Sequence, residues 1–395
     1  MEMIRLDFMD ARRCVMTIIF ISKSDKLKNF FILFLPTINF KDMYKRINGI
    51  QHIGVGVLDS EVSQKWYRKF LGMDIRMFDG VAPAPLMDVY THNETITKRA
   101  SMILNLQGGC AMEVVNPTTF QSRKVEFDIE LGDIAIYITQ VKTRDIQKAF
   151  DYFKTNGAKL LSDLVKMPDG SSTFYVEDPN ELIFQIVEGS NFYTNSKHVT
   201  GGPNGCVVGV TDIDNSRKLY SDILGYDKVV YDQTDIFEDY KSLKGGEKKF
   251  RRVRLAQSNP PGGGFAKVSA DTYIELIQAI DYKPKKVWKG RIWGDVGFVH
   301  IGLDVRGMKG LGEDLDAKGF GFTCDTKDTL DMGGTTRVHC TYIDDPDGIL
   351  IEMIEVYKIP IIEKLGIFLD VEKRDPLKPL PDMMLKALRF TRIKD

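Results

Sequence analysis

Three glutamates and two histidines lie within or beside apolar runs of the sequence, at positions where their side chains could take part in chemistry. Glu113, Glu275 and Glu352 each stand inside an apolar run, AMEVV, YIELI and LIEMI respectively. A carboxylate buried in such a strand without a partner is costly, so a metal ion or another cation is its natural neighbour. His52 and His300 each open an apolar run, HIGVGV and HIGLDV. A single histidine at such a place is more often structural, so its meaning depends on whether the pattern recurs.

The pattern recurs because the chain contains an internal repeat. The stretch HIGVGVLDSEVSQKWYRKFLGMD from His52 returns without a gap as GCVVGVTDIDNSRKLYSDILGYD from Gly205. Two further copies begin at Asp133, in GDIAIYIT, and at His300, and both finish with a DP turn and an apolar strand. Each copy opens with an alternating apolar run, typical of a half-buried strand, and then changes to helical periodicity. In the first and third copies we expect the helix to end at a Leu-Gly pair.

These copies predict an α+β fold of four βαβββ modules. We expect an extension outside the fold at 1–46, modules one and two at 47–190, modules three and four at 201–357, and a tail of short helices at 358–395. The polar segment NFYTNSKHVTGGPN separates modules two and three. The two apolar patches of the extension, VMTIIFI and NFFILFLP, are each too short to span a bilayer, and no convincing signal-peptide cleavage site follows the first.

The composition favours a small-molecule partner. The 54 basic and 55 acidic residues give a formal net charge of -1, which provides no broad attraction for nucleic acid or an anionic membrane surface. The five cysteines are scattered and lack CxxC spacing, which argues against disulfides and thiolate zinc sites and suits a reducing compartment. We therefore expect a cytoplasmic protein with no nucleic-acid or membrane partner.

The fourfold repeat and the ending DPDGILIE resemble the vicinal oxygen chelate superfamily, which includes glyoxalases, bleomycin-resistance proteins and extradiol dioxygenases. The resemblance implies that two modules pack side by side into a curved open barrel, so that four modules form two barrels. It also implies that metal ligands come from the first and last strands of the modules. Carried over, the first-strand positions are His52, Asp133, Gly205 and His300, and the last-strand positions are Glu113, Gln185, Glu275 and Glu352.

Which of these residues meet depends on how the modules pair. If the first module pairs with the fourth, one site holds His52, Glu113, His300 and Glu352, and the other two modules gather a degraded set. If neighbouring modules pair, Glu275 shares a site with His300 and Glu352, and His52 lies elsewhere. We favour the first arrangement, because it brings two histidines and two glutamates to one divalent ion. Imidazole and carboxylate donors suit Fe, Zn, Ni or Mn.

By this resemblance we expect a divalent-metal-dependent enzyme acting on an oxygenated small molecule, with lyase- or isomerase-like proton transfer through a metal-bound enolate. Glu352, and after it Glu113, would be the catalytic base. No cofactor-binding residues are expected beyond the metal ligands.

Two alternatives remain open. The first is a non-haem iron dioxygenase of the extradiol or hydroxyphenylpyruvate type, although Gly205 replaces a histidine of that pattern. The second is a non-catalytic ligand-binding protein of the bleomycin-resistance kind. Because lactoylglutathione lyases exchange modules between chains, a homodimer is one expectation.

Overall fold

The structure, a computed structural model, describes the side chains of residues 45–259, 262–269, 271–327, 336–359, 368–371, 374–375 and 377–393. Before residue 45 it describes only the backbone of three strands, β1 (Glu2–Asp10), β2 (Arg13–Ile21) and β3 (Phe31–Phe34), which pair with one another in that order. The prediction that residues 1–46 stand outside the fold therefore falls almost wholly outside the fully described residues.

Residues 46–362 form four modules of one strand, one helix and three further strands. In modules two and four the first of these three strands is broken into two short pieces that pair with the same neighbour. Module one contains β4 (Arg46–Gly56), α2 (Ser60–Leu71), β5 (Ile75–Pro83), β6 (Thr97–Leu104) and β7 (Ala111–Pro117). Module two contains β8 (Ile136–Thr143), α3 (Ile146–Thr155), the short β9 (Lys159–Leu160) and β10 (Val165–Lys166), then β11 (Ser172–Glu177) and β12 (Ile183–Glu188).

Module three contains β13 (Thr200–Gly209), α4 (Ile213–Tyr220), β14 (Lys228–Asp235), β15 (Phe250–Ala256) and β16 (Tyr273–Ala279), with the short α5 (Ala266–Ser269) before β16. Module four contains β17 (Gly297–Arg306), α6 (Met308–Ala317), the short β18 (Cys324–Asp325) and β19 (Leu330–Met332), then β20 (Thr336–Asp344) and β21 (Leu350–Ile362). The predicted α+β fold of four βαβββ modules is confirmed.

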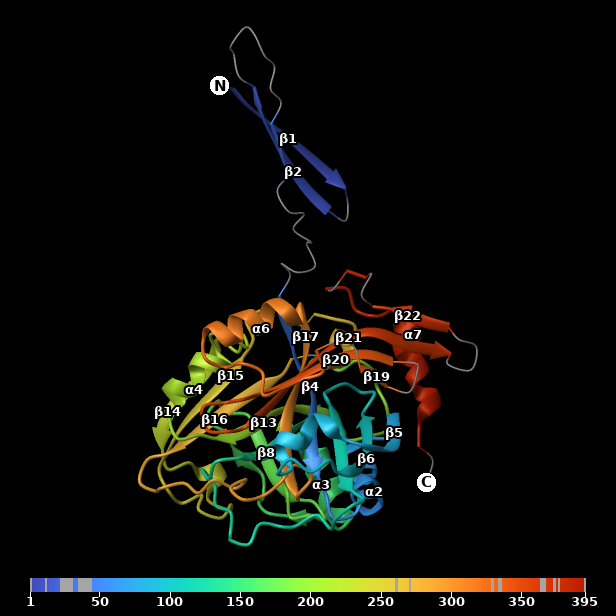
Figure 1. Cartoon of the computed structure of the whole chain (residues 1–395). Coiled ribbons are helices and arrows are strands. Elements are labelled where there is room, and N and C mark those ends of the chain that lie inside the picture. The colour runs from blue at the N-terminus through green and yellow to red at the C-terminus, as the bar shows by residue number, and fades with distance from the viewer. Residues whose placement is uncertain are drawn as a thin grey trace.

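The sheet pairs the modules crosswise. Within each module the last strand lies parallel beside the first, as β7 does beside β4 and β21 beside β17. Between modules, β4 pairs antiparallel with β17, and β8 pairs antiparallel with β13. Module one therefore pairs with module four, which we call the first barrel, and module two with module three, which we call the second barrel. Figure 1 shows the strands of both in the middle of the molecule.

The helices begin where short polar side chains can cap them. Asp59 accepts hydrogen bonds from the first free amides of α2, and Asp212 does the same at the matching place in α4. At the other end of α2, Gly72 adopts a left-handed conformation with φ 60, which an L side chain rarely adopts. The predicted Leu-Gly stop is therefore present in module one, while α4 ends at Tyr220, before Leu224-Gly225.

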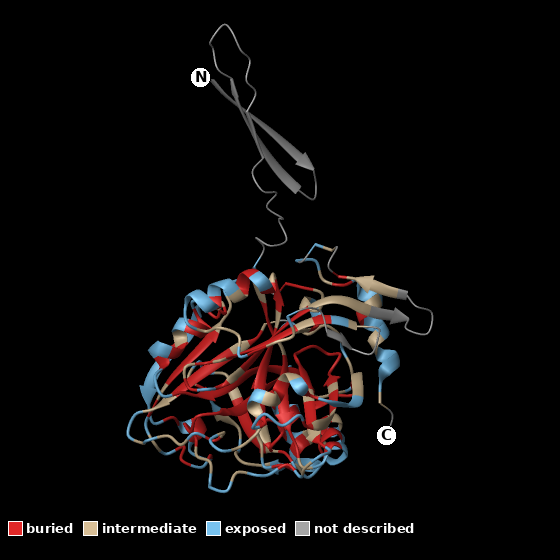
Figure 2. Ribbon diagram, in the orientation of Figure 1, coloured by how far each residue is buried: buried red, intermediate tan, exposed pale blue. Residues whose placement is uncertain are grey.

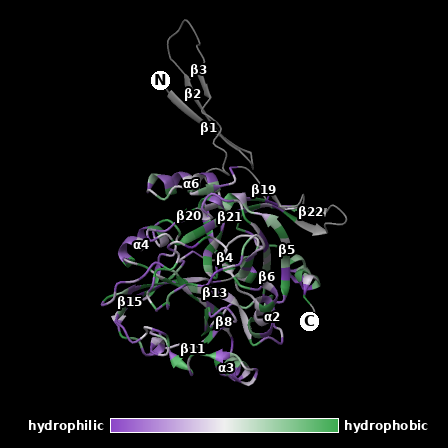
Figure 3. Cartoon of the chain, turned by 60° about the horizontal axis from the view of Figure 1, so that its bottom comes forward, coloured by the Kyte–Doolittle hydropathy of each residue, from purple (hydrophilic) through white to green (hydrophobic). Residues whose placement is uncertain are grey.

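The helices cover the outside of the strands and join neighbouring modules. Tyr67 on α2 donates a hydrogen bond to Asp178 of module two, and Tyr220 on α4 makes the corresponding bond to Asp345 of module four. Figure 2 shows buried strands beneath helices with exposed outer faces, and Figure 3 shows hydrophilic and hydrophobic stretches mixed along α4 and α6. Sheet pairing thus joins modules crosswise, while the helices tie each module to its neighbour along the chain.

The tail is more than short helices. Strand β21 runs past residue 357, and β22 (Ile367–Asp370) pairs antiparallel with it, before α7 (Asp382–Ala387) and the 3-10 turn η4 (Leu388–Thr391). In Figure 1 β22 and α7 lie beside the first barrel. Among the described residues, no helix is both long enough and apolar enough to cross a membrane.

Candidate metal centre

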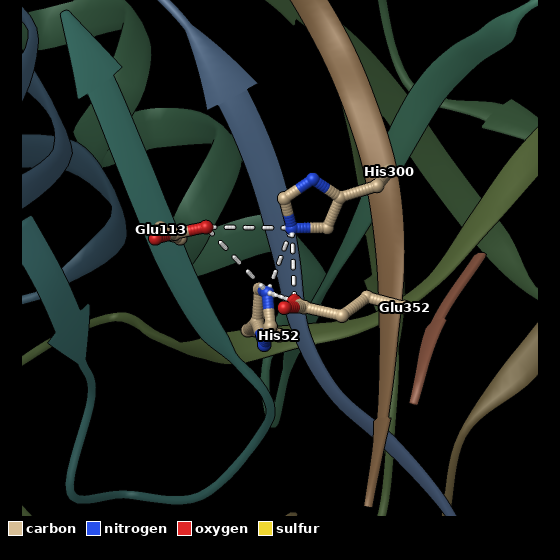
Figure 4. Close-up of side chains that lie close together, drawn as sticks. All are labelled: His52, Glu113, His300 and Glu352. Atoms are coloured by element: carbon tan, nitrogen blue, oxygen red, sulfur yellow. Dashed lines mark hydrogen bonds and ion pairs between the residues drawn. The ribbon is translucent and has the colours of Figure 1, made fainter. Parts of the chain in front are cut away.

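Two histidines face each other across the pairing of β4 with β17. The Nε2 atoms of His52 and His300 are 2.8 Å apart, and their rings are nearly perpendicular, at 87°. Both side chains are fully buried, at 1% and 0% exposed. Figure 4 shows the two rings pointing toward one another from neighbouring strands.

Two glutamates complete the cluster from the strands on either side. Glu352 on β21 places Oε2 3.1 Å from His52 Nε2 and 3.4 Å from His300 Nε2. Glu113 on β7 places Oε2 3.4 Å from His300 Nε2 and 3.9 Å from His52 Nε2. Their side chains keep 10% and 13% exposure, so the cluster is reached from the glutamate side. The structure thus brings together the four residues of the cross-paired site, with ligand atoms all within 4.8 Å of one another.

Two glycines make room for the imidazole rings. Gly54 is the register partner of His300, and Gly302 is the register partner of His52. A Cβ on Gly54 would lie against the His300 ring, and one on Gly302 against the His52 ring, in both cases far inside van der Waals distance. Each ring therefore lies over the glycine of the opposite strand. The HIG triplets at 52–54 and 300–302 supply both the ligand and the space for its partner.

The pKa values of the groups in and around the cluster are shifted from their ordinary values. Burial alone would lower the pKa of His52, but Glu352 and Glu113 outweigh it and raise that pKa. Burial alone would raise the pKa of Glu113, but its hydrogen bond to His300, with Lys98 and His52 nearby, lowers that pKa to about 2. Burial, with Glu352 and Glu113 close by, raises the pKa of Tyr342 well above its ordinary value. The site therefore favours a positive charge between the carboxylates.

The four donors fit a divalent first-row ion. Ligands in adjacent coordination positions at about 2.1 Å from such an ion lie about 3 Å apart. The five separations given above run from 2.8 to 3.9 Å. In the described part of the chain, the two histidines are the only ion-pair partners of Glu113 and Glu352. Gln51 Oε1 lies 3.2 Å from His52 Nδ1, where it can orient that ring.

Comparison with known proteins places the sequence in a family. The sequence profile described as the Glyoxalase/Bleomycin resistance protein/Dioxygenase superfamily matches residues 49–186 and 198–353. The chain belongs to this superfamily. The resemblance inferred from the repeat is thereby confirmed. No curated protein matches the chain in sequence.

Solved structures show the same fold. A mutant of glyoxalase I from Zea mays superposes with a TM-score of 0.50 at 14% identity, over 80% of this chain and 95% of that chain. A candidate dioxygenase from Bacillus subtilis subsp. subtilis str. 168 superposes with a TM-score of 0.55 at 13% identity, over 89% of this chain and 98% of that chain. These proteins share the superfamily's architecture with this chain, and the reaction has to be argued from the site.

The second barrel holds an arginine where the first holds its cluster. Glu275 on β16 is fully buried and accepts a hydrogen bond from Arg252 Nε at 2.7 Å. Arg252, also fully buried, pairs with Asp239 at 2.7 Å and lies 3.7 Å from the Tyr240 ring centroid. Burial alone would raise the pKa of Glu275, but Arg252 and Arg254 outweigh it and lower that pKa. A guanidinium thus supplies the positive charge beside this carboxylate, so Glu275, the alternative site member, does not join His300 and Glu352.

Gly205 and Gln185 lie in the second barrel at the positions that the repeat gives them. Val207 is the register partner of Glu275, as Gly54 is of Glu113, so Gly205 occupies the place of His52. Gln185 accepts a hydrogen bond from Gln140 at 2.8 Å and donates one to Tyr175 at 3.0 Å. These amides form a network within the second barrel.

The assignment of Asp133 to a first-strand position is wrong. Gln185 has Gln140 as its register partner on β8, so the residue two places earlier, Ile138, is the counterpart of His52. Asp133 precedes β8 and accepts hydrogen bonds from the backbone amides of Glu130 and Lys285. In the sequence, Arg252 and Arg254 alternate with apolar residues in RRVRLA, a pattern that fits an inward-facing arginine and an exposed strand face equally well.

Proposed function

We propose that the chain is a divalent-metal-dependent enzyme that acts on an oxygenated small molecule by lyase- or isomerase-like proton transfer. The observation that carries the proposal is the convergence of two imidazoles and two carboxylates within 4.8 Å. An ion held by His52, Glu113, His300 and Glu352 would supply Lewis acidity that stabilises the negative charge left when a substrate C–H loses its proton. All four residues come from one chain, so this site needs no second copy.

The two carboxylates are the candidates for moving the proton. Glu352 is the first, because it contacts both imidazole nitrogens and faces Tyr342 across the β20–β21 pairing. Glu113 is the second, because its pKa of about 2 keeps it ionised at neutral pH but makes it a weak base. The buried histidines hold the carboxylates in place and keep water from the inner side of the site.

The composition of the cluster favours proton transfer over oxygen chemistry. Non-haem iron oxygenases use two histidines with one carboxylate, which leaves positions open for oxygen and substrate. Here two carboxylates accompany the histidines. Glu275, which could have completed a dioxygenase-like site with His300 and Glu352, is held by Arg252.

The proposal is tested by metal loading followed by proton exchange. The protein is stripped with a chelator, reloaded separately with Zn, Ni, Mn or anaerobic Fe(II), and mixed in deuterated water with dihydroxyacetone or hydroxyacetone. We expect one bound ion per chain and a metal-dependent exchange of the carbon-bound proton, which is measured by NMR. Glu352→Gln should slow this exchange by about 10²-fold or more. Failure to bind any of the four metals would contradict the proposal. Oxygen uptake with catechol in the iron-loaded protein, without exchange, would favour the dioxygenase alternative.

A further inference from the structure

The second barrel contains a cavity of about 570 Å³ that does not include the metal centre. Its described lining comes from β8 and β12 through β16, together with the loops that follow β10 and β15. A volume of this size is typical of a small-molecule site. Two cationic side chains, Lys142 and Arg254, line it while being almost wholly buried, at 1% and 6% exposed. Buried cations normally have an anionic partner, and the partners of these two decide what the cavity can hold.

Lys142 has no carboxylate partner among the described residues. Its ammonium donates to the carbonyl oxygen of Asn191 at 3.1 Å, and its Nζ lies 4.9 Å from the centre of the Phe192 ring. The methylene chain packs so closely against Gly189 and Gly201 that a Cβ at either would touch it. Burial lowers the pKa of Lys142 to about 8, which leaves the ammonium charged at neutral pH. Asp271 lies near enough to raise this pKa slightly but forms no ion pair with the ammonium, so the fold fixes a buried positive charge at the cavity without a direct carboxylate contact.

Arg254 is only partly satisfied. Its Nη1 is buried with no hydrogen-bond partner, and lies 3.7 Å from Glu275 Oε2. That carboxylate already accepts hydrogen bonds from Arg252 at 2.7 Å and Tyr240 at 3.1 Å, and from Gln140 at 3.3 Å. Glu275 is therefore engaged by closer donors, and the Arg254 guanidinium, which lies 4.5 Å from the Tyr273 ring centroid, keeps donors for a ligand.

The first barrel lacks these cations. Arg254 is the register partner of Glu275, and the matching partner of Glu113 is Met102. Two residues earlier, Arg252 corresponds to Ala100. The small and apolar residues leave the first barrel open around its two carboxylates. In the second barrel, Arg252 supplies the positive charge beside the carboxylate of Glu275. Arg254 adds a second cation, which lines the cavity.

Acidic residues line the outer part of the cavity, and each is held by its own partner. Asp169 accepts from Ser171, Glu188 accepts from the backbone amide of Ser172, and Asp271 accepts from Asn191. Asp169 and Glu188 are exposed, unlike the two buried cations. Asn204, whose Oδ1 is buried without a partner, also lines the cavity and can accept a hydrogen bond from a ligand hydroxyl or amine. The charge distribution therefore suits an anionic group deep in the cavity and a polar remainder nearer the opening.

We propose that the second barrel binds a small molecule through a carboxylate or phosphate group held between Lys142 and Arg254. Two buried cations line the same cavity, one without an ion-pair partner among the described residues and one with a buried guanidinium nitrogen that has no hydrogen-bond partner and only a 3.7 Å contact to Glu275, and both can give such an oxyanion charge-assisted hydrogen bonds. The site does not depend on the proposed reaction at the metal centre.

The test uses inorganic phosphate and succinate as probes of the full-length protein. Binding is measured by calorimetry and by the rise in melting temperature, against sodium chloride at equal ionic strength. We expect saturable binding of at least one probe, and the one bound more tightly identifies phosphate or carboxylate as the preferred group. Lys142→Met and Arg254→Met should each weaken that binding by about tenfold or more. Lys228→Met, which removes an exposed cation lining the same cavity, should change it by less than about threefold.

Two further variants make the outcome decisive. Lys142→Met removes a buried charge that has no carboxylate partner, so without a probe this variant should melt no lower than the wild type. His300→Ala changes the metal centre and should leave probe binding unchanged. No saturable binding of either probe, equal binding in Lys142→Met, or loss of binding in His300→Ala would each overturn the proposal. The last result would place the anion at the metal centre.

Discussion

Arg252 donates its Nε hydrogen to Glu275 at 2.7 Å, at the place in the second barrel where Glu113 of the first barrel faces two histidines. Both carboxylates occupy the same repeat position on the last strand of their module; Glu275 is fully buried, and the Glu113 side chain is 13% exposed. A buried carboxylate needs a cation, and the two barrels meet that need differently. In the first, the donors suit a metal ion; in the second, the fold carries its own guanidinium.

Arg252→Met is expected to destabilise the protein by about 3–5 kcal/mol at neutral pH, because it leaves Glu275 and Asp239 buried without their main cation. Denaturant unfolding followed by circular dichroism measures the change. The matched control is Arg251→Met on the same strand, whose side chain is 24% exposed and pairs with Asp214 and Asp232. That control should lose about 1 kcal/mol or less. Equal losses in the two variants would contradict the role given to Arg252.

The deficit of Arg252→Met should depend on pH. In the wild type the pKa of Glu275 is lowered on folding, so its ion pair stabilises the fold above the unfolded pKa, about 4.3. That contribution is lost as pH falls through the folded pKa. The variant lacks most of it, so the difference between wild type and variant should be largest near pH 7 and shrink below about pH 4. A difference that is as large at pH 3 as at pH 7 would contradict this explanation.

Gly54→Ala and Gly302→Ala should each disturb the metal centre by displacing the histidine ring that lies over the glycine. The added methyl would meet the ring of His300 or His52, so the ring must move or the strands must separate. We expect a loss of about 1–3 kcal/mol in stability together with a metal affinity lowered by about tenfold or more. Gly80→Ala on β5, where an added Cβ meets nothing within 4 Å, is the control for glycine replacement in a strand. Unchanged metal affinity in both test variants would show that the imidazole rings do not need the space above these glycines to bind the ion.

The sequence predicted the parts of this molecule that depend on local pattern. Apolar alternation, helix caps and DP turns are each encoded by a few consecutive residues, so the order of the strands and helices in a module could be predicted from the sequence. Module two shares less of the repeat pattern, so the sequence does not define its register, and Ile138 occupies the position predicted for Asp133. The partnership of Arg252 with Glu275 could not be predicted, because an arginine that alternates with apolar residues also fits an exposed strand face. Such a contact depends on three-dimensional burial, which a single sequence does not record.

Asp345 should make the protein gain stability as pH falls through a defined window. Burial raises its pKa to about 6, despite hydrogen bonds from the amides of Asp347 and Ile349 and from Tyr220. Between the unfolded pKa, about 3.9, and the folded value, the folded state binds a proton that the unfolded state does not. The wild type should therefore lose about 3 kcal/mol from this group as pH rises through that range.

Asp345→Asn removes this titration while keeping an oxygen for the two amides. The stability of the variant relative to the wild type should rise by about 3 kcal/mol between pH 4 and pH 7. Unfolding curves across that range measure the difference, and Asp169→Asn in an exposed turn is the control. A variant that tracks the wild type at every pH would show that Asp345 is not protonated in the folded protein below pH 6.

Metal retention decides which residues form the site. His52→Ala, His300→Ala and Glu352→Ala should each abolish retention of a divalent ion through gel filtration, because each removes one of four converging donors. Gln185→Ala should retain about as much metal as the wild type, since its amide hydrogen-bonds Gln140 and Tyr175 in the other barrel. Glu275→Gln should also retain it, because that carboxylate pairs with Arg252. Metal per chain is measured by plasma mass spectrometry, with circular dichroism to show that each variant is folded.

The pairing of neighbouring modules predicts the opposite result: full metal occupancy without His52 and loss of the metal in Glu275→Gln. That result would remove the four-residue site and redirect the mechanism toward a dioxygenase-like arrangement around His300 and Glu352.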